Sequence, residues 1–480
     1  MTSKNLKYLF LFSIALFFAF LISLGVGIEP DTGTYIDKSV LRSPLYPLLI
    51  QTSEVLFGKG VYLPVIIIQL SLLFLSSFQL TRTLEKHFKL PAWLFGLVLW
   101  TLVGPYAIKW GHFLLSQGLA YPLFLLSVNA LLKTIFEKPL EQKFEAKQLA
   151  TFFAFTTLLI LTRRQFMFML VVGGCLILYK VIFALAGKNL NFKKIFCALL
   201  LIPISYGTAN IVERSYHYHY NGVFTTVPFV GVQLAVAPFY LAKAGDVRLF
   251  SDPTQKQIFE KVKQILQKNC TDAECEFKDL VPPYPHYYMN YNNISWGALW
   301  PGATDVIRNT ADMLNSVENK ALGTKITISV DKNLIDMSFI LIKAHFGKWL
   351  KLYISNIINN IGGYFFAMIL GFCFLGSFYL AFKAVLEQWR QSKNENETQN
   401  KHKTNEIQKE FAHKLSIGLW FIILMNFGNY SLVALVEPAM TVYNFYTNTI
   451  LTVFLLIVLW FTGRKLSSNY THERMANTYE

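Results

Sequence analysis

Residues 8–28 read YLFLFSIALFFAFLISLGVGI, and none of these side chains carries a charge. A helix needs roughly 20 mainly apolar residues to cross the hydrocarbon core of a bilayer. Lys4 and Lys7 precede this run, as basic residues precede the apolar part of a secretory signal peptide. The run has the length of a full span, however, and no small-x-small cleavage site follows it. We therefore expect an uncleaved first transmembrane helix.

Apolar runs of the same kind recur along the whole chain. Of its 480 residues, 53% are hydrophobic and 15% are charged, whereas soluble domains carry about 25% charged residues. The further runs are Val61–Leu80, Leu90–Ile108, Phe113–Leu132, Leu149–Thr162, Phe166–Gly187, Ile195–Val212, Leu352–Phe382, Leu415–Val436 and Phe445–Phe461. The fifth run is short for a span and the eighth is long. The sequence predicts an all-α polytopic membrane protein with about ten transmembrane helices.

Basic residues indicate the orientation of these helices. With both termini in the cytoplasm, the inward short loops hold most of the lysines and arginines, as the positive-inside rule requires. They are Arg82, Lys86, Lys89, Lys133, Lys138, Lys143, Lys147, Lys188, Lys193, Lys194, Lys383, Arg390, Lys393, Lys401, Lys403, Lys409, Lys414, Arg464 and Lys465. The net charge of +15 is then mostly charge that faces an anionic leaflet. We expect membrane lipids as partners and no nucleic acid.

The same pattern divides the chain into parts. Residues 1–212 form an N-terminal transmembrane module with a long first extracytoplasmic loop at 29–60, and residues 213–350 form a large extracytoplasmic loop domain before the last three helices. Residues 351–463 hold the C-terminal helices with a cytoplasmic polar loop at 387–414, and 464–480 form a cytoplasmic tail. In an oxidising compartment, the neighbouring Cys270 and Cys275 of the large loop are expected to form a disulfide. The lack of an obvious sorting signal and the Asn-, Lys- and Ile-rich usage favour a bacterial inner membrane.

Polar residues that suggest chemistry follow the first helix directly. Residues 28–35 read IEPDTGTY, and residues 42–47 read RSPLYP. Asp31 stands where a short helix could begin, so it could simply cap that helix. It could equally be a catalytic carboxylate at the membrane surface, because polar groups at the ends of membrane helices are costly unless they are used.

Two other outward turns carry candidate residues. Residues 161–165 read LTRRQ, and their two arginines break the positive-inside trend. These arginines either reach lipid headgroups along their apolar stems or bind a lipid-linked phosphate, which a guanidinium fork suits. Residues 436–443 read VEPAMTVY, where Glu437 is either an interfacial residue or part of a site. A glycine-rich phosphate loop, an HExxH motif and paired CxxC motifs are absent from the sequence, so a nucleotide-driven pump or a zinc protease is not expected.

The Pro-Asp-x-x-x-Tyr and Arg-x-Pro-x-Tyr-Pro elements of the first loop and the Leu-Thr-Arg turn resemble those of the GT-C glycosyltransferases. That superfamily includes the protein O-mannosyltransferases and the aminoarabinose transferase of lipid A. The resemblance implies an inverting enzyme that moves a sugar from a polyprenyl-phosphate donor to a lipid, glycan or protein hydroxyl on the outer face. It implies Asp31 as the catalytic base. The donor-phosphate ligands would be Arg163, Arg164 and Arg42, and the substrate-binding residues Glu29, Tyr35, Tyr46, Glu437 and Tyr443.

The chain departs from many relatives at two positions. Gln117 stands where a second acidic residue is common between the third and fourth helices, and Val442 precedes Tyr443 where an Arg-Tyr pair is common. Metal dependence is therefore open, with a divalent cation as a candidate cofactor. Two alternatives are an O-antigen-type polymerase or ligase and a lipid or solute transporter. Transporters commonly show internal repeats and polar residues at the bilayer midplane, whereas here the polar residues gather at the outer boundary.

Overall fold

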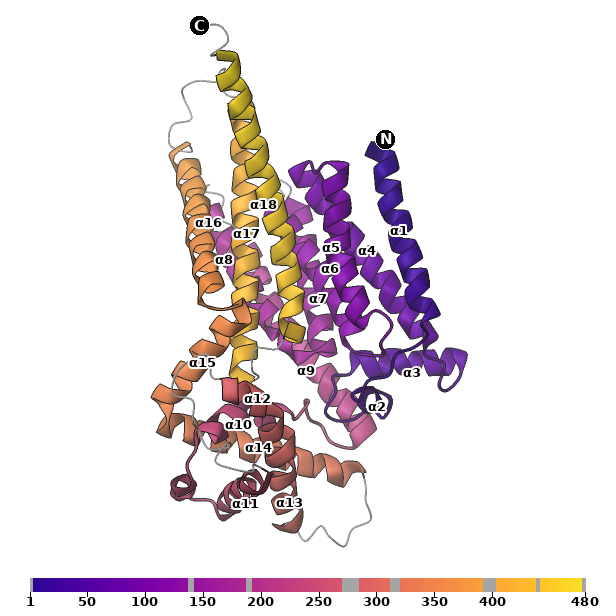
Figure 1. Ribbon diagram of the computed structural model, residues 1–480, viewed down its shortest axis with the longest axis vertical. Coiled ribbons are helices and arrows are strands. Elements are labelled where there is room, and N and C mark those ends of the chain that lie inside the picture. The colour runs from indigo at the N-terminus through magenta and orange to yellow at the C-terminus, as the bar shows by residue number, and fades with distance from the viewer. Residues whose placement is uncertain are drawn as a thin grey trace.

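The computed structural model describes residues 3–136, 142–186, 192–269, 285–310, 320–391, 403–436 and 441–476. Within these ranges the chain is helical, and the extended structure that occurs there is an isolated bridge between Gly27 and Phe113. Figure 1 shows a long helical bundle with a smaller helical lobe below it. Both termini lie at the end of the bundle that is farthest from the lobe.

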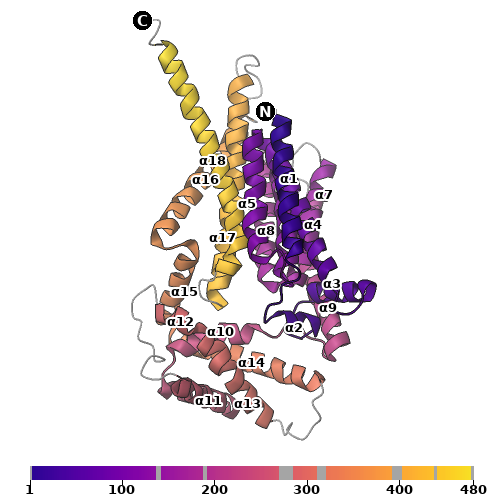
Figure 2. The same cartoon turned by 45° about the vertical axis from the view of Figure 1, so that its right-hand side comes forward.

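Ten helices of the described ranges form the bundle, and some that pack against each other are far apart in the sequence. They are α1 (Ser3–Ser23), α4 (Leu63–Phe88), α5 (Ala92–Trp110), α6 (Gln117–Phe136), α7 (Gln142–Thr162), α8 (Phe168–Ala186), α9 (Phe192–Asn221), α16 (Tyr364–Gln391), α17 (Lys403–Val436) and α18 (Thr441–Ala476). Helix α6 packs between α4 and α7. Helix α17 contacts α8, α16 and α18. Figure 2, turned by 45°, shows the same separation of bundle and lobe.

Within the described ranges, eight of these helices are long and apolar enough to cross a membrane, as expected for an integral membrane protein. They are α1, α4, α5, α6, α8 with the preceding turn, α9, α17 and α18. The other two expected runs also fall in helices. The apolar part of α7, Ala146–Thr162, is shorter than a span, and the run Leu352–Phe382 is divided between two helices.

The division of that run differs from the single long helix that its hydropathy predicts. Helix α15 (Phe346–Ile361) ends at Gly362 and Gly363, whose φ angles are 101° and 100°. Glycine adopts this left-handed region without the steric cost that a side chain would add, so the pair ends the helix. The chain then turns by 81° into α16, which gives a ninth span if the bent pair counts as one.

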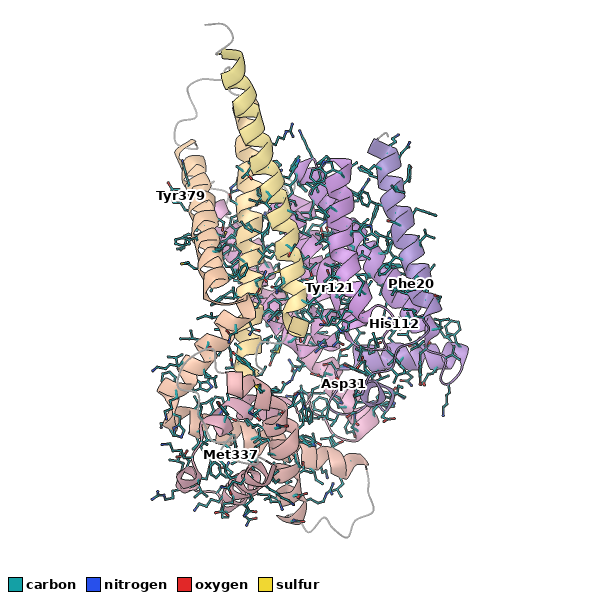
Figure 3. The ribbon with its side chains drawn as sticks, in the orientation of Figure 1. Phe20, Asp31, His112, Tyr121, Met337 and Tyr379 are labelled. Atoms are coloured by element: carbon teal, nitrogen blue, oxygen red, sulfur yellow. The ribbon has the colours of Figure 1, made fainter. Side chains whose placement is uncertain are left out.

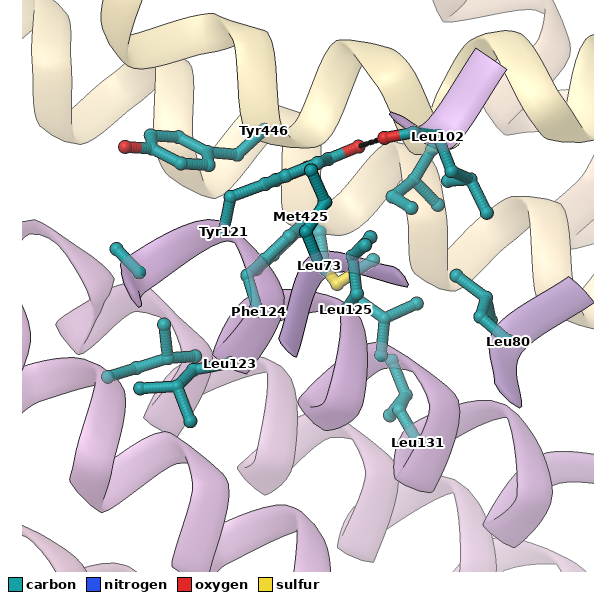
Figure 4. Packing of buried hydrophobic residues seen from close by; sticks show 14 of the residues in the cluster. Leu73, Leu80, Leu102, Tyr121, Leu123, Phe124, Leu125, Leu131, Met425 and Tyr446 are labelled. Carbon is teal, nitrogen blue, oxygen red and sulfur yellow. Dashed lines mark hydrogen bonds between the residues drawn. The ribbon is translucent and has the colours of Figure 1, made fainter. Parts of the chain in front are cut away.

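The interior of the bundle is packed with apolar side chains. Leu73, Phe124 and Met425 come from three different helices and meet there with little or no exposure (Figure 4). Tyr121 is also fully buried, and its hydroxyl donates a hydrogen bond of 3.0 Å to the carbonyl of Leu102. This bond satisfies a polar group that would otherwise be costly in an apolar interior.

The lobe has a hydrophobic core of its own, separate from that of the bundle. Its elements are α10 (Val230–Leu241), η2 (Ala244–Leu249), α11 (Pro253–Asn269), α12 (Pro285–Ile294), η3 (Ser295–Leu299), α13 (Trp300–Thr310), α14 (Lys320–Ala344) and α15. Ile258 and Val262 of α11, at the helical spacing seen in the sequence, are buried in this core with Met337 of α14 (Figure 3). The lobe thus folds around side chains that it supplies itself.

Helices α10 and α14 approach each other most closely at Gly231. The Gly231 N–H donates a hydrogen bond of 2.5 Å to the Asp331 carboxylate, and a Cβ at this position would meet the Asp331 backbone. Burial raises the pKa of Asp331, while the same Gly231 N–H lowers it. The close contact therefore depends on the absence of a side chain.

Gly231→Ala is expected to lower the free energy of unfolding by about 1–3 kcal/mol, the usual cost of overpacking. Thermal unfolding in detergent measures the change. Gly323→Ala is the matched control on α14, because a Cβ there meets nothing within 4 Å. That control should be neutral or gain up to about 1 kcal/mol from helix propensity. Equal melting temperatures for the two variants would show that α10 and α14 do not pack as described.

Candidate functional site

A short extended contact fixes the start of the first loop. The Gly27 N–H donates to the His112 carbonyl at 2.7 Å, and the Leu114 N–H donates to the Gly27 carbonyl at 2.9 Å. A Cβ on Gly27 would lie 2.5 Å from the Phe113 ring, so only glycine permits this approach. The buried Thr32 hydroxyl adds a bond of 3.2 Å to the Leu114 carbonyl. The loop is therefore attached to the turn between α5 and α6.

Asp31 stands at the N-cap position of α2 (Thr32–Ile36), but its side chain makes no capping hydrogen bond. Instead, its Oδ1 atom lies 2.7 Å from a guanidinium nitrogen of Arg42, and 60% of the Asp31 side chain is exposed. Arg42 also donates to the Thr34 hydroxyl at 2.6 Å and to the Tyr35 hydroxyl at 3.4 Å. Figure 3 shows Asp31 at the end of the bundle nearest the lobe. The capping interpretation is therefore wrong, and the carboxylate is accessible.

Tyr35 and Tyr46 form the buried floor of this loop. The Tyr35 hydroxyl lies 2.8 Å from the Ser116 hydroxyl, and its ring meets that of Tyr46 edge-on at 5.2 Å. Tyr46, in α3 (Leu45–Phe57), donates to the side-chain amide oxygen Oε1 of Gln69 at 3.3 Å. Burial, and then the nearby Tyr35, raise the pKa of Tyr46 well above its ordinary value. The Tyr46 hydroxyl therefore stays protonated inside the protein, and the Tyr35 hydroxyl accepts the hydrogen bond that helps to hold Arg42 in place.

The two arginines of the outward turn take different partners, although they are adjacent in sequence. Arg164, which opens η1 (Arg164–Met167), has its Nε atom 3.2 Å from a Glu213 carboxylate oxygen, and it donates to the Asn210 side chain at 2.7 Å. Arg163 lies close enough to Tyr446 to interact with its side chain electrostatically, and Tyr446 is also within electrostatic range of Tyr35. Arg163 is thus the arginine of this turn that lies beside the first loop's aromatic floor.

Glu213 is the functional candidate that the sequence prediction missed. The predicted helix ends at Val212, but α9 continues to Asn221, and Glu213 is only 2% exposed. Ser43 of the first loop lies 3.5 Å from the Glu213 carboxylate, so the Asp31–Arg42 loop and Arg164 are joined through this residue. The spacing of Glu213, Tyr216, His217 and Asn221, all buried on one side of α9, was a signal that the helix continues.

Several predicted site residues contribute less to this arrangement or lie outside it. Glu29 is exposed, and its backbone N–H donates to the Thr32 hydroxyl at 3.0 Å. Glu437, Cys270 and Cys275 lie outside the described residues, so the proposed disulfide does too. Tyr443 belongs to α18, but its side chain is not among those described.

Among the described residues, no three His, Cys, Asp or Glu side chains gather closely enough to form a metal site. The charged partner of Asp31 is instead the Arg42 guanidinium. What the arrangement offers chemically is an accessible carboxylate with one guanidinium group beside it.

Comparison of the chain with protein-family models, with curated proteins and with solved structures finds no match in any of the three.

Proposed function

We propose that this protein is a membrane glycosyltransferase that moves a sugar from a polyprenyl-phosphate donor to an acceptor hydroxyl, with inversion at the anomeric carbon. One observation carries the proposal. An exposed carboxylate, Asp31, is paired with Arg42 at the end of the bundle that faces the lobe. Through Ser43 and Glu213 the same loop is linked to Arg164, so an acidic and a basic function lie near one membrane boundary.

The chemistry of such a transfer needs these two functions. Asp31 would accept the proton of the acceptor hydroxyl as its oxygen forms a bond to the anomeric carbon. The bond from that carbon to the lipid phosphate oxygen breaks, and the phosphate leaves with the electron pair. This leaving group is a weak base, so it requires cationic stabilisation more than a proton donor. Arg42 and Arg163 are the candidates for that role, because Arg164 faces the buried Glu213 carboxylate, whereas the carboxylate beside Arg42 is the exposed Asp31 itself.

The arrangement of the helices supports an orientation for the reaction. Both termini lie at the end of the bundle opposite the lobe (Figure 1), as two cytoplasmic termini would require. The proposed site and the lobe then face the outside of a bacterial inner membrane, where an acceptor lipid, glycan or protein would be met. The lobe is the natural place for acceptor contacts, since it lies below the first loop (Figure 2).

The proposal is tested by turnover of defined donors. Purified protein in detergent with native lipids is given a panel of short-chain polyprenyl-phosphate sugars, and release of polyprenyl phosphate is followed by mass spectrometry. Release with at least one sugar, dependent on acceptor, is the expected result. Turnover only of pyrophosphate-linked glycans would indicate a polymerase or ligase instead. Counterflow of a solute without any covalent change would indicate a transporter.

A further inference from the structure

A cavity lined by both apolar and charged side chains lies at the end of the bundle where α1 begins, since its Glu85 pairs with Lys7. Its volume is about 560 Å³, and it opens between the end of α4, the end of α6 and the beginning of α7. The lining residues are Phe78, Gln79, Arg82, Thr83, Glu85, Lys86, Lys133 and Gln148. A volume of this size is in the range that small ligands occupy.

The charges around this cavity favour an anion. Three basic side chains, Arg82, Lys86 and Lys133, line it together with one carboxylate, Glu85. Glu85 is already paired with Lys7 of α1, and Arg82 lies 3.8 Å from its second oxygen. The lining therefore carries an excess of positive charge contributed by two different helices. Amide groups of Gln79 and Gln148 add neutral hydrogen-bonding partners.

One face of α4 connects the cavity to the apolar part of the bundle surface. Ile68, Ser71 and Leu75 are exposed and follow each other at helical spacing. The same face continues through Gln79, Arg82 and Lys86 into the cavity. A ligand with a phosphate headgroup and an acyl chain would fit this face, with the headgroup in the cavity and the chain along Leu75 and Ile68. A free anion would use only the head end.

We infer that this cavity binds the headgroup of an anionic phospholipid from the leaflet at the termini end of the bundle. The inference is independent of the proposed glycosyl transfer, because the cavity lies at the other end of the helices from Asp31. Basic pockets between membrane helices are suited to phosphate headgroups, and each Lys or Arg near the surface strengthens the attraction. Two helices contribute to the site, because Lys133 of α6 and Arg82 of α4 line the same cavity. This distinguishes it from a lipid contact made by the surface of one helix.

The test is native mass spectrometry of delipidated, full-length protein titrated with phosphatidylglycerol in a neutral detergent. Wild type should bind one lipid molecule more tightly than the rest. The double variant Arg82→Gln/Lys133→Gln should bind it about thirty-fold more weakly, as expected for the loss of two charges. The charge-conserving variant Arg82→Lys/Lys133→Arg should retain binding, which separates loss of charge from loss of fold.

The matched control removes two charges that lie outside the cavity. Lys193→Gln/Lys383→Gln changes exposed lysines on α9 and α16 and should bind the lipid as wild type does. Equal binding by Arg82→Gln/Lys133→Gln and wild type would overturn the inference. Displacement of the lipid by glycerol 3-phosphate at an equal concentration would also overturn it, because the site would then be one for a soluble anion.

Discussion

Asp31→Asn is expected to lower the turnover of a polyprenyl-phosphate sugar about 10²–10⁴-fold while donor binding stays close to that of wild type. The range is the usual contribution of a positioned general base. Asparagine keeps the size of the side chain but cannot accept the proton from the acceptor hydroxyl. The Asp31–Arg42 pair is partly exposed, so its loss should change the free energy of unfolding by at most about 1 kcal/mol. Single-turnover kinetics and a separate donor-binding measurement distinguish the two effects.

Asp37→Asn is the matched control for that experiment. Asp37 lies in the same loop, directly after α2, and is exposed. The change in charge and size is identical, so a general electrostatic effect of the loop would slow both variants equally. Turnover near the wild-type rate for Asp37→Asn, with a large loss for Asp31→Asn, is the expected result. Full activity of Asp31→Asn would remove this residue from the mechanism.

The largest effect on stability is expected from Arg164→Ala. Glu213 is 2% exposed and has Arg164 as its charged partner at 3.2 Å. Removal of one partner from a buried pair costs about 3–5 kcal/mol, because the remaining charge is left without compensation. Arg164→Ala should therefore unfold at a much lower fraction of SDS in mixed micelles than wild type does.

Two further variants make the result specific to the pair. Arg164→Gln/Glu213→Gln removes both charges and should recover most of the lost stability. Arg214 is an exposed arginine next to Glu213 in the sequence, and its guanidinium lies over the Phe224 ring at 5.7 Å. Arg214→Ala should lower the free energy of unfolding by no more than about 1 kcal/mol. If the double variant is as unstable as Arg164→Ala, the charge of Glu213 is not what destabilises the single variant.

The sequence predicted the helical membrane fold because apolar runs of sufficient length have few other solutions. All ten expected runs lie mainly in helical structure, although the run in α7 is shorter than a span and the run Leu352–Phe382 is divided between α15 and α16. The bend at Gly362 and Gly363 was missed because hydropathy does not register backbone conformation, whereas a glycine pair inside an apolar run is a signal for it. The packing of α10 on α14 could not be predicted, since it depends on contacts between residues 100 positions apart.

The candidate site was predicted in part. Asp31 and Arg42 lie eleven positions apart within one loop, so their pairing needed only that the loop fold back on itself. The sequence could not predict that the adjacent Arg163 and Arg164 have different neighbours. Those neighbours, Tyr446 and Glu213, belong to α18 and α9, so they depend on how these two helices pack against the turn. The sequence predicts Glu213 as the first residue of a loop, because a charged residue that ends an apolar run usually leaves the membrane. In the structure Glu213 is buried, and Ser43 of the first loop and Arg164 both lie against its carboxylate.

The configuration of the product tests the proposed mechanism most directly, a single displacement with Asp31 as the base. NMR of the glycoside formed by wild-type protein from a donor of known anomeric configuration gives the result. The proposed mechanism predicts inversion at the anomeric carbon, because in it the acceptor oxygen activated by Asp31 would attack from the side opposite the lipid phosphate. Retention of configuration would contradict this account, since it requires a covalent intermediate or a different route of attack.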